Sequence, residues 1–434
     1  MSIFTNIRLG LLHVAIAITF VAINGVLNRI MIADSGILAT VVVILVVIPY
    51  VLSPMQVWVG QYSDENPIFG YRRSPYILVG MLMTFVGMVL TPHAALLLAE
   101  NFWAGFGLGL LAFGMWGIGY NLAVVSYLSL ASDLSDEGQR SRTIAVMWFM
   151  MIVSIIISAI VIGRSLEPYS NAQLFMTFRV AAGVGIGLTL LGLVGLEPRY
   201  VAKAETEQRI TQKESISAVI NNPQARIFFV YLILMLVAIL GQDVLLEPYG
   251  AHAFNMTVEE TTQLTALWGG MTLISLLLYG FVLNRFMSKK TGAMLGGVIA
   301  TLGLLAIALS GMGGYAGLFQ PGIAILGFGT GIATSTNLGL MLDMTTTAQA
   351  GLFIGAWGVA DSASRGIGML LGGTVRDLVT FAFDNVTLGY TSVFMIEAVF
   401  LVISMSLLAQ IDVSEFRNQH ETSFVELAAL SADA

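Results

Sequence analysis

The chain has no cysteine among its 434 residues, only four histidines, and only 10% charged residues. The lack of cysteine excludes disulfides, cysteine-based metal sites and thiol catalysis, although it does not identify a compartment. The Walker A, HExxH and GxSxG motifs are also missing, and the glycine-rich stretches 105–109 and 327–331 do not follow a strand of a βαβ unit. We therefore expect no enzymatic activity. No basic patch on a soluble domain exists, so we expect no nucleic-acid partner.

Apolar residues, in contrast, make up 57% of the chain, and the mean hydropathy is +0.85. A membrane-spanning helix needs about 20 mostly apolar residues. Twelve stretches meet this requirement, so the sequence predicts an all-α polytopic membrane protein. The predicted spans cover residues 9–31, 36–60, 76–98, 102–130, 143–163, 173–196, 227–247, 262–284, 291–311, 317–342, 349–375 and 387–411.

The basic residues orient the predicted spans. With the N-terminus inside, fourteen lysines and arginines lie on the cytoplasmic side, three lie on the other side, and two fall within spans. Because cytoplasmic loops carry an excess of lysine and arginine, this asymmetry predicts that both termini are cytoplasmic. The first span is too long for a signal peptide and is followed by Asn28 and Arg29 instead of a small-residue cleavage site, so we expect it to be retained.

The longest polar interval divides the spans six and six. We interpret 1–196 as an N-terminal six-helix bundle, 197–226 as a cytoplasmic linker, 227–411 as a C-terminal six-helix bundle and 412–434 as a cytoplasmic tail. Asp133 precedes Trp148 after span 4 much as Asp343 precedes Trp357 after span 10, which indicates a duplication. Paired halves of this kind are typical of transporters that rock about a central cavity.

The loop after span 2 carries a charged motif, GQYSDENPIFGYRRSP, which begins at Gly60. It resembles the loop between helices 2 and 3 of the major facilitator superfamily, with extra residues between the aspartate and the arginines. Together with the six-and-six division, this resemblance implies the major facilitator fold. Asp64, Arg72 and Arg73 would then form a cytoplasmic gate that closes against a neighbouring helix end. An ordinary stop-transfer loop is the alternative.

Three charged residues lie within the last two spans, where each costs roughly 2.5–3.5 kcal/mol on insertion scales. Asp361 and Arg365 lie one turn apart on one face of span 11, and Glu397 lies near the centre of span 12. We expect these three residues to contact one another or to line a cavity, as an intramembrane charge network. Two interpretations are open: the excess carboxylate serves proton coupling, or the set is a static ion pair with Glu397 protonated.

Other polar residues gather on spans 1, 4, 7 and 10, which line the central cavity in the major facilitator fold. A pathway for a substrate would require such a pattern, whereas each residue alone could equally form a hydrogen bond between helices. The candidate binding residues are His13, Asn24, Asn28, Tyr120, Asn121, Gln242, Asp243, Glu247 and Asn337.

Four segments resemble one branch of this superfamily, the PucC/LhaA family of bacteriochlorophyll delivery. They are NGVLNRIMI (24–32), GYRRSPYI (70–77), GQDVLLEPYG (241–250) and GLFIGAWGVADSASRGIGMLLGG (351–373). The similarity covers nearly the whole chain, and the span-7 motif is its most specific part. It implies an integral protein of a photosynthetic membrane (inner, intracytoplasmic or thylakoid). The implied partners are membrane lipid, (bacterio)chlorophyll and light-harvesting or reaction-centre polypeptides.

The cofactor that this resemblance implies is chlorophyll or bacteriochlorophyll, bound transiently. The pigment magnesium takes one axial ligand, for which His13, Asn24, Asn28, Gln242 and Asp243 are candidates, and we expect no separate metal site. The resemblance favours an assembly factor that binds the pigment and delivers it to antenna or photosystem apoproteins. The alternatives are a proton-coupled secondary transporter of a small amphiphile and a pigment-free chaperone or structural subunit of antenna complexes.

Overall fold

The computed structural model describes residues 3–135, 140–199, 223–313, 315–343 and 350–411, and these contain helices and no strand. Up to residue 199 the elements are α1 (Ile3–Phe20), η1 (Val21–Leu27), η2 (Ile30–Asp34), α2 (Ala39–Val46), α3 (Ile48–Val51), α4 (Met55–Glu65), α5 (Ser74–Glu100), α6 (Phe102–Leu134), α7 (Arg140–Ser165) and α8 (Asn171–Leu193). From residue 223 they are α10 (Pro223–Gly241), η4 (Gln242–Val244), α11 (Leu246–Phe254), α12 (Val258–Phe281), η5 (Leu283–Arg285), α13 (Lys289–Ser310), η6 (Ala316–Leu318), α14 (Phe319–Asp343), α15 (Ala350–Phe383) and α16 (Val386–Gln410).

Eleven helical segments within the described residues are long and apolar enough to cross a membrane. They coincide with eleven of the predicted spans, which confirms an all-α polytopic membrane protein. The remaining predicted span, 36–60, is helical but interrupted, because α2, α3 and α4 are only 8, 4 and 11 residues long. The second span is therefore a broken helix.

Two prolines explain this interruption, since proline has no backbone N–H and removes the helical bond to the carbonyl four residues earlier. Pro49 lies in the first turn of α3, and Pro54 directly precedes α4. Because α3 ends at Val51, the carbonyl of Pro49 accepts a hydrogen bond from Asn121 Nδ2 of α6 instead, at 2.8 Å. Asn121 Oδ1 accepts in turn from Gln56 Nε2 of α4 at 2.6 Å. Asn121 of α6 thus forms hydrogen bonds with the broken span on both sides of the break.

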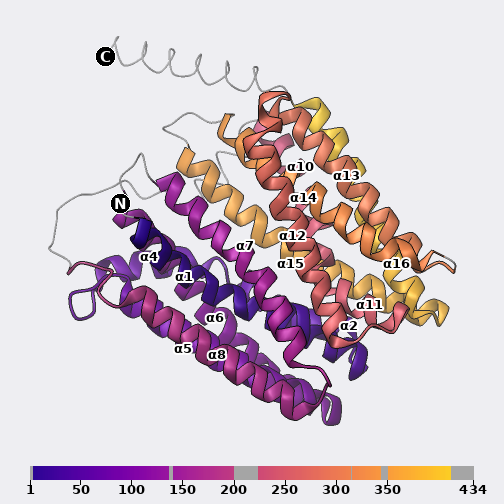
Figure 1. Cartoon of the computed structure of the whole chain (residues 1–434), viewed down its shortest axis with the longest axis horizontal. Coiled ribbons are helices and arrows are strands. Elements are labelled where there is room, and N and C mark those ends of the chain that lie inside the picture. The colour runs from indigo at the N-terminus through magenta and orange to yellow at the C-terminus, as the bar shows by residue number, and fades with distance from the viewer. Residues whose placement is uncertain (1–2, 136–139, 200–222, 314, 344–349, 412–434) are drawn as a thin grey trace.

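The helices pack in two groups that repeat one pattern. In the first group α1 contacts α7 and α8, and α5 contacts α6; in the second, α10 contacts α15 and α16, and α13 contacts α14. In Figure 1 the first group runs from indigo to magenta at the lower left, and the second, mainly orange and yellow, lies at the upper right. With α2–α4 counted as one broken span, each group is a six-helix bundle.

The two bundles meet where α7 contacts α12 and where α2 contacts α15. At the second contact Asp377 of α15 accepts hydrogen bonds from the backbone N–H groups of Ala39 and Thr40, at 3.2 and 2.7 Å. Thr40 Oγ1 donates to the same carboxylate at 2.7 Å, and Arg376 Nη1 lies 2.7 Å from it. Because a carboxylate stabilises the positive end of a helix, Asp377 caps α2 from the opposite bundle.

Most of the predicted linker and the whole predicted tail, 200–222 and 412–434, lie outside the described residues. The domain boundaries drawn at these segments therefore stay predictions. The cytoplasmic orientation of the termini is likewise a prediction from the charge pattern.

Candidate functional site

The site forms where span 7 is interrupted. The short turn η4 separates α10 from α11. Pro248 in the first turn of α11 has no N–H to donate to the carbonyl of Val244, four residues earlier. Asn28 of the first span supplies the missing donor, because its Nδ2 lies 2.5 Å from Val244 O. A side chain of the first bundle therefore supplies the hydrogen bond that the interruption of span 7 removes in the second bundle.

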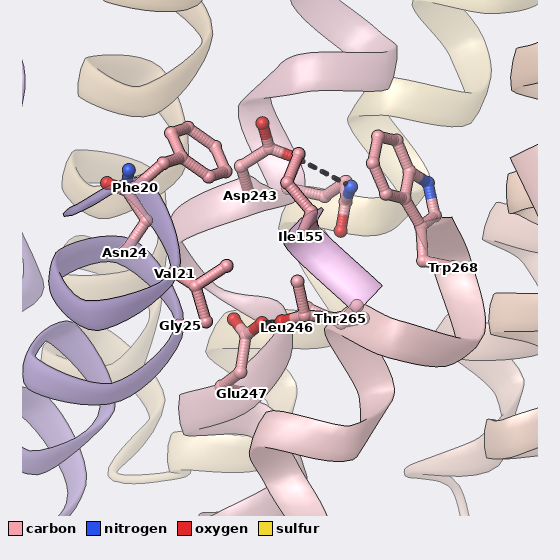
Figure 2. Close-up of a pocket in the computed structure, with 11 residues that line it drawn as sticks. Phe20, Val21, Asn24, Gly25, Ile155, Asp243, Leu246, Glu247, Thr265 and Trp268 are labelled. Carbon is pink, nitrogen blue, oxygen red and sulfur yellow. Dashed lines mark hydrogen bonds between the residues drawn. The ribbon is translucent and has the colours of Figure 1, made fainter. Parts of the chain in front are cut away.

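Opposite this break, the first span widens into the π-helical stretches η1 and η2, and η1 carries Asn24. A cavity lies between α1–η1, α7, α12 and the interrupted span (Figure 2). Its volume is about 30 Å³, which is room for one or two water molecules. The lining residues are Phe20, Val21, Asn24, Gly25, Ile155, Gln242, Asp243, Leu246, Glu247, Thr265 and Trp268.

Several polar atoms at this cavity have no hydrogen-bond partner among the described residues. They are both side-chain atoms of Asn24, Oε1 of Gln242, Oε2 of Glu247 and Nε1 of Trp268. The other atoms of these groups are bonded: Gln242 Nε2 donates to Asp243 Oδ1 at 2.9 Å, and Thr265 Oγ1 donates to Glu247 Oε1 at 2.5 Å. Because an unsatisfied buried polar atom costs about 1–3 kcal/mol, the cavity is suited to water or another small polar group.

A charged cluster extends from the cavity to α15. Arg365 Nη1 lies 3.4 Å from Asp243 Oδ2, and its Nε lies 3.2 Å from Asp361 Oδ2. The guanidinium carbon lies 5.9 Å from the ring centroid of Tyr50. One arginine thus joins two carboxylates and an aromatic face, and it links the interrupted span to α15 and the broken second span.

Glu397 forms no hydrogen bond with this cluster among the described residues, so its place in the predicted network with Asp361 and Arg365 stays a prediction. Its side chain is buried, and neither carboxylate oxygen has a hydrogen-bond partner among the described residues. Glu397 lies on α16 beside Gly241. A Cβ added to Gly241 would lie 2.7 Å from Oε1 of Glu397 and 3.2 Å from the backbone of Gly368. Span 7, not span 12, presents the carboxylate that reaches Arg365.

The other candidate binding residues do not line the cavity. His13 is buried between Tyr127 and Trp148, with ring centroids 5.3 and 5.7 Å away. Asn337 Oδ1 accepts a hydrogen bond from the hydroxyl of Tyr231 at 2.6 Å. The ring of Tyr120 packs 6.4 Å from that of Trp116, and Asn121 braces the broken second span as described above. Of the nine candidate binding residues, four line the cavity: Asn24, Gln242, Asp243 and Glu247. Asn28 bonds to Val244 beside them.

The three predicted gate residues lie together between the end of α4 and the start of α5. Asp64 lies 2.7 Å from Arg72 Nη2 and 2.5 Å from Arg73 Nη2, and Arg73 Nε lies 3.2 Å from Asp133 Oδ2 at the end of α6. Glu197, which follows α8, accepts from the backbone N–H groups of Arg72 and Arg73 at 2.8 and 3.0 Å. These contacts tie together α4, α5, α6 and the chain after α8, while the gating role stays a prediction.

Sequence reasoning missed Thr265, Trp268 and Ile155 at the cavity. Thr265 fixes Glu247, and Trp268 and Ile155 close the cavity on the side of α12 and α7. A neutral residue in a long apolar span gives no signal of its own, and these three became recognisable only from the packing of α7 against α12.

The cavity does not fit the tetrapyrrole that the sequence resemblance implies. Asn24, Gln242 and Glu247 offer oxygen atoms of the kind that magnesium prefers. Pockets for drug-sized ligands, however, measure about 300–1,000 Å³, and this one measures about 30 Å³. In this conformation the cavity suits water or a small polar group.

Comparisons with known proteins identify the family. The family model described as "PUCC protein" matches residues 26–416. "Protein PucC" of Cereibacter sphaeroides is 31% identical over 419 residues, which cover 92% of this chain and 90% of that one. The "Bacteriochlorophyll synthase 44.5 kDa chain" of Rhodobacter capsulatus is 28% identical and covers 92% of each chain.

A solved structure supports the fold. The bacterial homologue of the human lysosomal transporter Spinster, in an inward-facing and occupied conformation, superposes with a TM-score of 0.70 at 14% identity. The match covers 95% of this chain and 97% of that one, and it confirms the predicted major facilitator fold. The family model and the PucC relatives confirm the resemblance seen in the sequence. Because the family model spans nearly the whole chain, this membrane protein belongs to the PUCC protein family.

Proposed function

We propose that the protein is a non-enzymatic assembly factor that binds (bacterio)chlorophyll and delivers it to light-harvesting or reaction-centre polypeptides. The observation that carries this proposal is the alignment over 92% of the chain with a relative whose name refers to bacteriochlorophyll synthesis. The protein is a photosynthesis-related integral membrane protein, as its PucC relatives indicate.

Purification from a phototrophic host in mild detergent tests this proposal. Absorption spectra and solvent extraction should give about one pigment per chain, and an unrelated major facilitator protein purified from the same membranes should give none. A colourless preparation that still retains antenna or reaction-centre polypeptides would refute pigment binding and would favour the pigment-free chaperone. The polypeptides are identified by mass spectrometry of the same fractions.

A proton-coupled transporter is the second candidate, and the charged interior favours it. Asp243, Arg365 and Asp361 form a cluster beside the cavity, and Glu397 carries two unpartnered oxygens nearby. In proteoliposomes, Glu397→Gln would then abolish flux of an amphiphile driven by a proton gradient. Glu260→Gln is the matched control, because Glu260 only caps the start of α12. Equal fluxes in the two variants would exclude proton coupling through Glu397.

A further inference from the structure

The loop between α4 and α5 contains a tight hairpin turn. Ile68 and Tyr71 exchange two backbone hydrogen bonds, of 2.9 and 3.0 Å, across the central residues Phe69 and Gly70. Both central residues have positive φ, 53° and 80°. Two-residue hairpin turns of this kind favour Asn-Gly, Asp-Gly or Gly-Gly, because bulky side chains rarely adopt positive φ. The turn therefore holds a phenylalanine in a backbone conformation that this residue disfavours.

Packing within the chain does little to offset this strain, because the Phe69 side chain is 89% exposed. The other non-glycine residues with positive φ in the described part of the chain are Asn255 and Asp384, types that adopt it more readily. The chain after the turn is held in place by the backbone hydrogen bonds to Glu197 described above. A fixed hairpin that presents a strained, exposed phenylalanine indicates a contact outside the chain.

The equivalent loop of the second bundle also presents a phenylalanine. Phe286 lies between α12 and α13 and is 79% exposed. The two loops follow the second and the eighth spans, so they lie on the same side of the membrane. Arg73 of the first loop turns inward and lies 3.2 Å from Asp133. Lys290, at the start of α13, likewise donates to the carbonyl of Ile411 at 2.7 Å. Each loop thus directs a basic side chain inward and a phenylalanine outward.

The length of α5 places the hairpin near the headgroups of the bilayer. Helix α5 has 27 residues and begins at Ser74, directly after the hairpin loop. At 1.5 Å per residue it is about 40 Å long, whereas the hydrocarbon core is about 30 Å thick and the bilayer with its headgroups about 40–45 Å. The usual tilt of about 20° shortens this extent by only a few ångströms. The hairpin therefore lies close to the boundary between hydrocarbon and headgroups.

Exposed aromatic side chains mark this boundary at both ends of the helices. Trp58 and Tyr62 of α4 are exposed on the approach to the hairpin, and their rings stack 5.3 Å apart. At the opposite ends of the helices the exposed aromatic residues include Trp103, Tyr315 and Phe381. Tryptophan and tyrosine are enriched at both membrane–water interfaces. Phe69 thus continues an aromatic belt that already faces the lipid interface.

We propose that the hairpin at Phe69 and the loop at Phe286 are paired membrane anchors, one for each bundle, whose rings insert among the lipids of the interface. Two observations select lipid over a protein partner: the depth of the hairpin and its continuity with the aromatic belt. Burial of the ring in the interface supplies free energy that offsets the strained turn. The predicted gate residues Arg72 and Arg73 directly follow the hairpin, so the anchor also fixes their depth. This inference does not depend on pigment binding.

Because the chain contains no cysteine, a fluorophore can be attached at one introduced site. Ile68→Cys places the label beside Phe69, and the protein is embedded in nanodiscs of phosphatidylcholine. A nitroxide on the lipid near its headgroup should quench this label, whereas iodide in the water should not. Phe69→Asn preserves the turn, since Asn-Gly is favoured there. It should shift the label toward iodide by about tenfold or more in the insertion equilibrium, the value of one phenylalanine ring. Phe286→Asn is the matched control and should leave this label unchanged.

Three results would overturn the proposal. Strong quenching by iodide with Phe69 present would show that the ring stays in water. Equal quenching by the nitroxide with and without Phe69 would show that the fold alone sets the depth of the loop. Protection from iodide that appears only after antenna polypeptides are added would make the hairpin a protein-docking site. Phe286→Cys, labelled in the same way, tests the second loop and repeats the measurement if Ile68→Cys does not fold.

Discussion

Replacing Asp377 by alanine should loosen the contact between the two bundles at the start of α2. The carboxylate accepts two backbone N–H groups and one hydroxyl of α2, and these bonds join residues more than 330 positions apart in the chain. Loss of an N-terminal helix cap costs about 0.5–2 kcal/mol. Loss of the negative charge at the same helix end adds about 0.3–1 kcal/mol. Asp377 also pairs with the buried Arg376, and loss of one partner of a buried ion pair costs about 3–5 kcal/mol, so we expect Asp377→Ala to lower the free energy of unfolding by about 3–5 kcal/mol.

Asp377→Asn separates these two contributions. Asparagine keeps one oxygen acceptor for the cap but removes the charge that pairs with Arg376, so it should lower the free energy of unfolding by less than Asp377→Ala does. Denaturant titration of the purified protein in detergent, with helical circular dichroism as the signal, measures both variants against wild type. The expected order of stability is wild type, then Asp377→Asn, then Asp377→Ala.

A double-mutant cycle with Thr40→Val provides the control. Thr40 Oγ1 donates to Asp377, so its removal should cost free energy in the wild type and almost none in Asp377→Ala. Two results would refute the reasoning: a change within about 0.5 kcal/mol for Asp377→Ala, as for an ordinary surface residue, or strictly additive effects in the cycle.

Three further predictions concern the interior. Asn28→Ala leaves the carbonyl of Val244 without its donor and should lower the free energy of unfolding by about 1–3 kcal/mol, measured by the same titration; an unchanged midpoint would contradict this. Gly241→Ala should destabilise by about 1–3 kcal/mol because its Cβ meets a carboxylate oxygen at 2.7 Å, whereas Gly270→Ala, with open space around it, should not. Arg365→Met leaves two carboxylates unpaired and should cost about 3–5 kcal/mol or abolish accumulation in membranes, unlike Arg365→Lys; equal yields of the two variants would argue against the ion pairs.

Contacts within one helix were predictable from the sequence, but contacts between helices were not. Asp361 and Arg365 stand four residues apart, and this spacing alone places them in contact on any α-helix. Whether Glu397 or Asp243 completes the cluster depends on the rotation and depth of separate helices. Apolar spans with weak periodicity do not determine that rotation, so the sequence did not indicate that Asp243 reaches Arg365.

Side chains that bond to the backbone were also missed. Glu197 and Asp377 stand near the ends of predicted spans, where acidic residues are common, and their partners are N–H groups at the starts of α5 and α2. Every residue has such an N–H group, so no complementary side chain marks these pairs in the sequence. Pro248, in contrast, directly follows the predicted span 227–247 and was a usable signal, because it has no N–H to donate to the carbonyl of Val244.

The bond between Asn28 and Val244 has a consequence for biosynthesis. Its two residues are 216 positions apart, so the first span leaves the ribosome long before its partner is made. Until span 7 is inserted, the bond to Val244 cannot form, and the other contact of the Asn28 amide is the carbonyl of Asn24, 3.3 Å away on its own helix. The first span therefore enters the bilayer without this bond, and a chain that stops after the sixth span would lack it. The hydrogen bond of Asn28 to Val244 forms only after the second half of the chain has been translated.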